Sequence, residues 1–191
     1  MLKLEKENYN TPEYYNNVLI SHIDTSGFDY SDEERIDLLL NRFIGGKLFD
    51  IGCGVSPLCV KAHQAGAEVW GLDFAEEYIK KVKEKYPQIN YVVGDSNKLP
   101  FEDEFFNYAV LGEVLEHSVS PRRILKEAFR VLKQGGRLAI STPTGETKKN
   151  HPYPQHIWGF NAEDIIKMVG KERITSMTIW GTNTLICHAK K

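Results

Sequence analysis

The chain has 191 residues, the size of one domain, so it can bury a substantial core but leaves no room for a separate substrate domain. Its 24 Lys and Arg residues nearly balance 26 Asp and Glu residues, and a formal charge of −2 lacks the basic excess of a nucleic-acid binder. No apolar run approaches the roughly 18 residues that span a bilayer, and the polar N-terminus does not resemble a signal peptide. We therefore expect a cytoplasmic protein without membrane or nucleic-acid partners, whose oligomeric state stays open.

The first thirty residues carry aromatic side chains among polar ones, which fits either a lid over a ligand or a plain packing helix. The aromatic residues are Tyr9, Tyr14, Tyr15, Phe28 and Tyr30. A capping-box pattern at Ser31-Asp32-Glu33-Glu34 then predicts a helix, with Gly45-Gly46 as its end. Its expected apolar face consists of Ile36, Leu39, Leu40 and Phe43.

Strand and helix patterns alternate over the next hundred residues. We predict strands at 47–51, 68–72, 90–94, 107–112 and 137–142, and helices at 57–65 and 75–86. Another helix is expected to be capped by Ser120, to begin at Pro121 and to carry its apolar stripe as far as Leu132, before a turn at Gly135-Gly136. After a loop over 143–160, Asn161 is expected to cap a last helix, and strands at 173–180 and 184–189 to form a hairpin.

One strand, Leu48 to Ile51, leads directly into a glycine turn and a helix that begins at Pro57. Gly52 and Gly54 lack a Cβ, so the backbone can bend sharply there and a ligand can approach it closely. The next strand ends at Asp73, 19 residues beyond Gly54, where a βαβ unit places an acid for ribose hydroxyls. A glycine turn beside an ordinary surface Asp is the alternative interpretation.

The glycine pattern departs from that of nicotinamide-binding proteins, which usually have a third glycine where this chain has Pro57. Asp50-Ile51-Gly52-Cys53-Gly54 instead resembles motif I of the class I S-adenosylmethionine-dependent methyltransferases, with Ser56 at the family's frequent third glycine. The resemblance continues in family order to about residue 143. The matching segments are Val92-Val93-Gly94-Asp95-Ser96, Leu99-Pro100-Phe101, Phe105-Phe106-Asn107, Val110 to His117 and Val131 to Leu138.

The resemblance implies an α/β fold: a Rossmann-like seven-stranded sheet, mostly parallel with one antiparallel strand, and helices on both faces. It also implies that S-adenosylmethionine binds across the carboxyl ends of the strands and leaves as S-adenosylhomocysteine. By this resemblance Asp50 helps to hold the ammonium group, Asp73 the ribose and Asp95 the adenine amino group. The expected cofactor site comprises Asp50, Gly52, Cys53, Gly54, Asp73, Phe74, Asp95, Ser96, Gly112 and Glu113. Phe74 is interpreted equally well as an adenine contact or as a core residue.

Methyl transfer requires a group that removes a proton from the acceptor, and His117, just after the fourth strand of the repeat, is the first candidate. A capping or packing role is the alternative. His156, in the loop over 143–160 with His151, Tyr153 and Trp158, is the second candidate, and this loop is expected to form a wall of the acceptor site.

Glu113, Glu116 and His117 stand at i, i+3 and i+4, so a helical turn would place them on one face. With His156 they form an E-x-x-E-H and later His pattern, similar to that of metal-dependent small-RNA 3′-terminal methyltransferases and ubiquinone-pathway O-methyltransferases. A divalent metal therefore stays an open alternative to a directly acting base.

The sequence has three cysteines, Cys53, Cys59 and Cys187, without metal-ligand spacing, and we expect buried free thiols. The whole chain, 1–191, is expected to be one methyltransferase domain for a small-molecule acceptor, with a hydroxyl oxygen as the favoured atom. A protein that binds S-adenosylmethionine without catalysis, and a metal-assisted O-methyltransferase, are the alternatives.

Overall fold

The structure, a computed structural model, describes residues 1–3, 11, 13–14, 33–55, 57–146 and 155–191. Several predicted features lie outside these residues: most of the expected N-terminal lid, the capping residue Ser31, the motif residue Ser56, and His151 and Tyr153 of the expected acceptor wall. The expected lid and the middle of the loop over 143–160 therefore stay predictions.

A seven-stranded sheet in the order β4-β3-β2-β5-β6-β9-β8 forms the centre of the molecule. Neighbours among the first five strands run parallel, whereas β9 is antiparallel to both β6 and β8. The predicted Rossmann-like sheet with one antiparallel strand is therefore confirmed. The strands are β2 (Lys47–Ile51), β3 (Glu68–Asp73), β4 (Asn90–Val93), β5 (Phe106–Gly112), β6 (Leu132–Pro143), β8 (Ile174–Trp180) and β9 (Thr184–Lys190).

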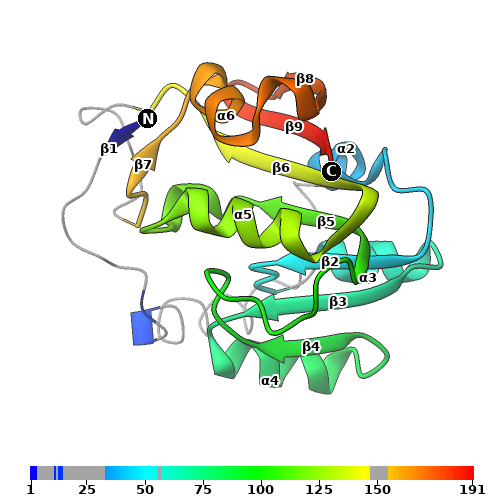
Figure 1. The fold of residues 1–191 in the computed structure, drawn as a ribbon. Coiled ribbons are helices and arrows are strands. Elements are labelled where there is room, and N and C mark those ends of the chain that lie inside the picture. Colours follow the sequence, from blue (N-terminus) through cyan, green and yellow to red (C-terminus); the bar gives the residue numbers. More distant parts are fainter. Residues whose placement is uncertain (4–10, 12, 15–32, 56, 147–154) are drawn as a thin grey trace.

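Helices pack on both faces of this sheet (Figure 1). Because side chains alternate between the faces of a strand, Phe49 joins the core under α5 and α6, while its neighbour Leu48 joins the core under α2, α3 and α4. The helices are α2 (Glu33–Leu40), α3 (Pro57–Gln64), α4 (Glu76–Lys85), α5 (Pro121–Val131) and α6 (Ala162–Val169), with 3-10 turns η2 (Leu115–His117) and η3 (Lys171–Arg173). α6 begins with the reciprocal capping box of Asn161 and Asp164.

The prediction for the chain between α5 and β6 is wrong in two details. Leu132 is the first residue of β6 and not part of the helix, and the strand continues through the glycines that were expected to form a turn. The pairing jumps from Phe106↔Leu132 to Tyr108↔Arg137, so a bulge with Gly135 at φ +74° absorbs the extra residues. Ser120 does stand at the N-cap of α5, but its side chain makes no capping hydrogen bond to the described residues.

The carboxyl ends of β4, β3, β2 and β5 lie side by side, because these strands are parallel and adjacent. In such a sheet the ligand site lies just beyond these ends, where the chain order reverses between β2 and β5. A second, two-stranded sheet pairs β1 (Leu2–Lys3) with β7 (Trp158–Gly159), so the N-terminus meets the end of the loop over 143–160. The fold thus gathers the predicted site residues along one edge.

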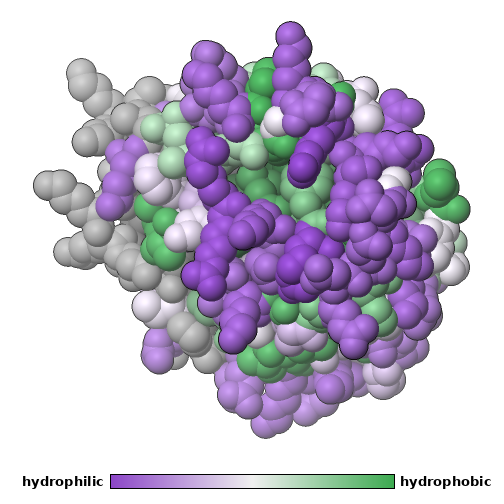
Figure 2. Space-filling model, in the orientation of Figure 1, coloured by the Kyte–Doolittle hydropathy of each residue, from purple (hydrophilic) through white to green (hydrophobic). Residues whose placement is uncertain are grey.

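The face of the molecule that carries α5 is covered mainly by hydrophilic residues, with hydrophobic ones visible between α5 and α6 (Figure 2). Among the described residues, none of the helices combines the length and the apolar character that crossing a bilayer requires.

Candidate functional site

The glycine turn after β2 bends toward the end of β3. Gly52 has φ +78° and donates its N–H to the Leu72 carbonyl at 2.7 Å. A Cβ on Gly52 would lie 2.7 Å from Cγ2 of Val114, so no larger residue fits there without displacing the segment after β5. Gly54 has φ +48°, and a Cβ placed on it would meet no atom of the described residues within 4 Å. The turn therefore leaves space for a ligand beside exposed backbone.

Asp73 closes this turn from the end of β3. Its Oδ2 accepts the Gly54 N–H at 3.1 Å, and its Oδ1 accepts the Ala75 N–H at 3.0 Å. Burial raises the pKa of this carboxyl, and the two N–H groups oppose that rise. Each carboxylate oxygen has a second lone pair, so Asp73 can also accept hydrogen bonds from the two hydroxyls of a ribose. The open Gly54 and the buried Asp73 therefore fit an adenosine-type ligand.

Three further predicted cofactor residues follow the ends of β3 and β4. Phe74 is half-buried directly after the end of β3. Asp95 is exposed, and its Oδ1 accepts the backbone N–H and the side-chain amide of Asn97 at 2.8 and 2.9 Å. Ser96 is half-buried beside it. The structure places all three at the same edge as Asp73.

Asp50 lies on β2 beneath the turn, 5% exposed, and accepts a hydrogen bond from the Cys59 thiol at 3.4 Å. Burial raises the pKa of its carboxyl to about 7, while the Cys59 thiol and the charge of Arg35 oppose the rise. The three cysteines are buried free thiols, as predicted, with Cys53 in the turn itself. Asp50 thus connects β2 to α3 through the Cys59 thiol, and its carboxyl ionises near neutral pH.

This pKa makes the stability of the protein depend on pH. A carboxyl whose pKa rises from 3.8 to about 7 on folding stabilises the fold fully below pH 4, and this contribution is lost as the pH rises to 7. We expect the free energy of unfolding to fall by about 2 to 3 kcal/mol between pH 5 and pH 8 relative to Asp50→Asn, which cannot ionise. Urea denaturation of both proteins at the two pH values measures the difference. Parallel pH profiles would contradict the assignment.

Sequence reasoning missed Arg35, which reaches from α2 across the end of β5. Its Nη1 donates to Ser141 Oγ at 3.0 Å and lies 3.9 Å from a carboxylate oxygen of Glu113. A Cβ on Gly112 would touch the same guanidinium at 3.5 Å. Glu113 has φ +57°, which costs free energy for a residue with a Cβ and is typical of functional turns. No local pattern in the sequence relates Arg35 to residues almost eighty positions later.

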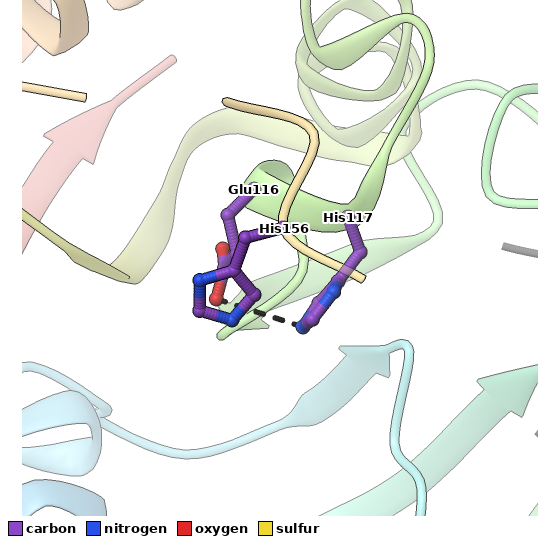
Figure 3. Close-up of side chains that lie close together, drawn as sticks. All are labelled: Glu116, His117 and His156. Atoms are coloured by element: carbon purple, nitrogen blue, oxygen red, sulfur yellow. Dashed lines mark ion pairs between the residues drawn. The ribbon is translucent and has the colours of Figure 1, made fainter. Parts of the chain in front are cut away.

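Directly after Glu113 the chain brings together Glu116, His117 and His156 (Figure 3). One ligand atom from each of these side chains lies within 4.8 Å of the others, and the two imidazole rings meet edge to face with centroids 4.8 Å apart. Glu116 is fully buried; Thr142 Oγ1 donates to its Oε2 at 3.0 Å, while its Oε1 lies 3.9 Å from His117 Nε2. Burial raises the pKa of Glu116 well above its usual value, with the charge of Glu113 adding to the effect.

Each imidazole of this cluster is oriented through its Nδ1. His156 Nδ1 lies 2.8 Å from Oε1 of Glu146, a buried carboxylate, and His117 Nδ1 lies 3.2 Å from the Gln155 carbonyl. Burial and the neighbouring His156 lower the pKa of His117 to about 4, so its ring is neutral near pH 7. Glu146 is the second residue of the candidate site that sequence reasoning missed, since a Thr-Gly-Glu segment in a loop carries no recognisable signal.

The predicted four-residue group is therefore only partly assembled. Leu115 to His117 form a 3-10 turn that excludes Glu113, and the Glu113 carboxylate lies beside Arg35. The prediction that residues 113–117 share one helical face is wrong. The positive φ of Glu113 changes the direction of the backbone before the 3-10 turn begins at Leu115. Glu116, His117 and His156 do come together, and the Glu146 carboxylate contacts His156 Nδ1 at 2.8 Å.

Comparison with known proteins agrees with the fold described above. The family model described as "Methyltransferase domain" matches residues 49–140, which contain the glycine turn, Asp73 and η2. A demethylmenaquinone methyltransferase of Lysinibacillus sphaericus is 31% identical over 133 residues, which cover 66% of this chain and 56% of that protein. The ubiquinone/menaquinone biosynthesis C-methyltransferase UbiE of Desulfotalea psychrophila is 32% identical over 113 residues, 57% of this chain and 46% of that protein. The chain spans about half the length of these relatives.

Two solved structures show the same fold over almost their whole length. The cyclase SpnF superposes with a TM-score of 0.84 at 14% identity, covering 98% of this chain and 97% of its own. An S-adenosylmethionine-dependent methyltransferase of Mesorhizobium loti superposes with a TM-score of 0.69 at 17% identity, covering 84% of this chain and 97% of its own. At these identities the likeness concerns the fold. Motif order, sheet topology and the family match lead to one conclusion: residues 49–140 match a methyltransferase domain, and the chain has the fold of the class I S-adenosylmethionine-dependent methyltransferases.

Proposed function

We propose that the protein transfers a methyl group from S-adenosylmethionine to a hydroxyl oxygen of a small molecule. The observation that carries the proposal is the cluster of buried Glu116 and His156 with half-buried His117 beyond β5. Glu116 follows Val114 by two residues, and the Val114 side chain packs against the glycine turn. When bound, S-adenosylmethionine supplies a methyl whose bond to sulfur breaks with the electron pair left on sulfur. The protein's task is then to align the acceptor, exclude water and remove one proton.

On the cofactor side we assign roles by position along the sheet edge. Asp73 accepts the ribose hydroxyls, the backbone of Gly52, Cys53 and Gly54 lines the amino-acid portion, and Asp50 helps to hold its ammonium group. Phe74, Asp95 and Ser96 surround the adenine. Gly112 and Glu113 close the site from β5, with Arg35 holding the Glu113 carboxylate in place.

On the acceptor side we propose a pocket between the N-terminal thirty residues and the loop over 143–160. The pairing of Leu2 with Gly159 and of Lys3 with Trp158 supports this, because it attaches the N-terminus to the end of that loop. Trp158 donates its indole N–H to the Ser118 carbonyl at 2.7 Å, which fixes the loop against the chain after η2. His117 and His156 then act on the acceptor, and not on cofactor affinity.

A ring carbon made nucleophilic by a neighbouring hydroxyl is the second candidate acceptor, favoured by relatives named as quinone-pathway and C-methyltransferases. Both candidates require that a hydroxyl lose its proton beside the methyl group, so the same cluster serves either. Reduced quinone rings bearing free hydroxyls are therefore the first acceptors to test. The position of the methyl in the product, read by NMR, separates oxygen from carbon.

Cofactor binding is tested without an acceptor. We expect S-adenosylmethionine and S-adenosylhomocysteine to raise the melting temperature in a saturable manner, because a ligand that binds only the native state stabilises it by mass action. At a hundred times the dissociation constant the gain is about 2.7 kcal/mol. NAD should produce no shift. A shift with NAD alone would overturn the cofactor assignment.

Turnover separates an enzyme from a protein that only binds the cofactor. With a suitable acceptor, S-adenosylhomocysteine should accumulate in proportion to the methylated product. Tight binding of S-adenosylmethionine with no turnover across a broad set of hydroxylated acceptors would favour the non-catalytic alternative.

A further inference from the structure

We propose that Glu116, His117 and His156 form a binding site for one divalent transition-metal ion, with Glu146 as a positioning residue. Two imidazoles and one carboxylate make a mixed nitrogen and oxygen ligand set that suits ions such as Zn²⁺. Mg²⁺ and Ca²⁺ prefer oxygen ligands throughout, so these nitrogen ligands disfavour them.

The three side chains already converge on one point (Figure 3). In a tetrahedral zinc site with bonds of about 2.1 Å, the ligand atoms lie about 3.4 Å apart. Their separation of at most 4.8 Å here would shrink by up to about 1.4 Å, a movement within reach of side-chain rotation. The ligands come from η2 and from the segment just before β7, and the Ile157 N–H holds these two together by donating to the Glu116 carbonyl at 2.8 Å.

The Glu116 carboxylate supplies an independent indication of a ligand. It is fully buried, Thr142 satisfies only its Oε2, and Oε1 has no hydrogen-bond partner among the described residues. A buried polar atom without a partner destabilises the fold, and more strongly when the group is charged. The Oε1 atom is directed toward the two imidazoles, where a cation would satisfy it.

The surroundings of the two histidines match those of metal ligands. Metal-binding imidazoles almost always donate their second ring N–H to a carboxylate or a backbone carbonyl. His156 Nδ1 faces the buried Glu146 carboxylate at 2.8 Å, and His117 Nδ1 faces the Gln155 carbonyl at 3.2 Å. Donation from both Nδ1 atoms would leave each Nε2 with the lone pair that binds a metal.

Three protein ligands leave a tetrahedral ion with one position for a water or an acceptor oxygen. This consequence rests on the proposed function: an acceptor hydroxyl beside the ion would lose its proton more readily, because a Lewis acid lowers its pKa. Metal binding itself does not depend on the methyl-transfer proposal. The two can therefore fail separately.

The test measures metal binding on the full chain without acceptor. After chelator treatment and dialysis, the protein should bind one Zn²⁺ by calorimetry and one Co²⁺ with visible ligand-field absorption. Glu116→Gln, His117→Ala and His156→Ala should each weaken Zn²⁺ binding by at least tenfold, and Glu146→Gln by about 10- to 100-fold. His63→Ala on α3 is the matched control and should bind normally.

Circular dichroism and S-adenosylmethionine affinity show whether each variant is folded. Failure of the native protein to bind Zn²⁺ or Co²⁺ would overturn the metal site, as would unchanged affinity in the folded His117→Ala and His156→Ala variants. Chelator-resistant turnover together with absent metal binding would leave the proposed function intact. Metal binding without turnover on any acceptor would support the metal site and reject the proposed function.

Discussion

Replacing His117 or His156 with alanine is expected to lower turnover about 100-fold or more, while the dissociation constant of S-adenosylmethionine stays near its native value. Both rings belong to the cluster beyond β5, whereas the residues assigned to the ribose, the adenine and the amino-acid portion of the cofactor lie at the ends of β2, β3 and β4. Loss of either ring removes a group that handles the acceptor proton, directly or as a metal ligand. Single-turnover formation of S-adenosylhomocysteine and calorimetric cofactor binding measure the two quantities.

His63→Ala is the control for this experiment, because His63 lies on α3 outside the cluster and should turn over normally. Native turnover in both single variants would show that the cluster takes no part in the chemistry. Proximity and the exclusion of water would then be the remaining sources of rate acceleration. A large loss of cofactor affinity would instead place the histidines on the wrong side of the methyl group.

The second large effect is expected at Asp73. Asp73→Ala should weaken S-adenosylmethionine binding by about 1 to 3 kcal/mol, roughly 5- to 150-fold, because the ribose hydroxyls lose their acceptor. The substitution also leaves the Gly54 and Ala75 N–H groups without the carboxylate that they contact at 3.1 and 3.0 Å. Part of the loss therefore arises from a looser glycine turn, and calorimetry should show a larger effect for Ala than for Asn.

Asp37→Ala is the matched control, since Asp37 is an exposed carboxylate on α2 that pairs with Lys61. It should bind the cofactor normally. Unchanged affinity in Asp73→Ala would show that the ribose is bound elsewhere, and it would remove the main argument for the assigned cofactor orientation.

The cofactor half of the site could be predicted from local sequence because a strand, a glycine turn and a helix are formed by neighbours in the chain. The alternation of strands and helices also predicted a parallel sheet, and parallel strands bring their carboxyl ends to one edge. The positions of Gly52, Gly54 and Asp73 at this edge therefore follow from local sequence patterns without knowledge of long-range contacts. The prediction was wrong for the end of α2, which lies at Leu40 and not at Gly45-Gly46. It was also wrong for the start of β6, because a bulge at Gly135 depends on pairing with β5 and not on the glycines alone.

The acceptor half depended on contacts that no local pattern encodes. The sequence spacing predicts that Glu113 lies with Glu116 and His117. The positive φ of Glu113 instead directs its side chain toward Arg35, a residue of α2 far earlier in the chain. Glu146 reaches His156 across a loop, and Thr142 satisfies one oxygen of Glu116 from the end of β6. In irregular segments the sequence has no periodicity from which the direction of a side chain can be predicted. The partners of these side chains depend on which buried polar groups need hydrogen bonds once the sheet has formed.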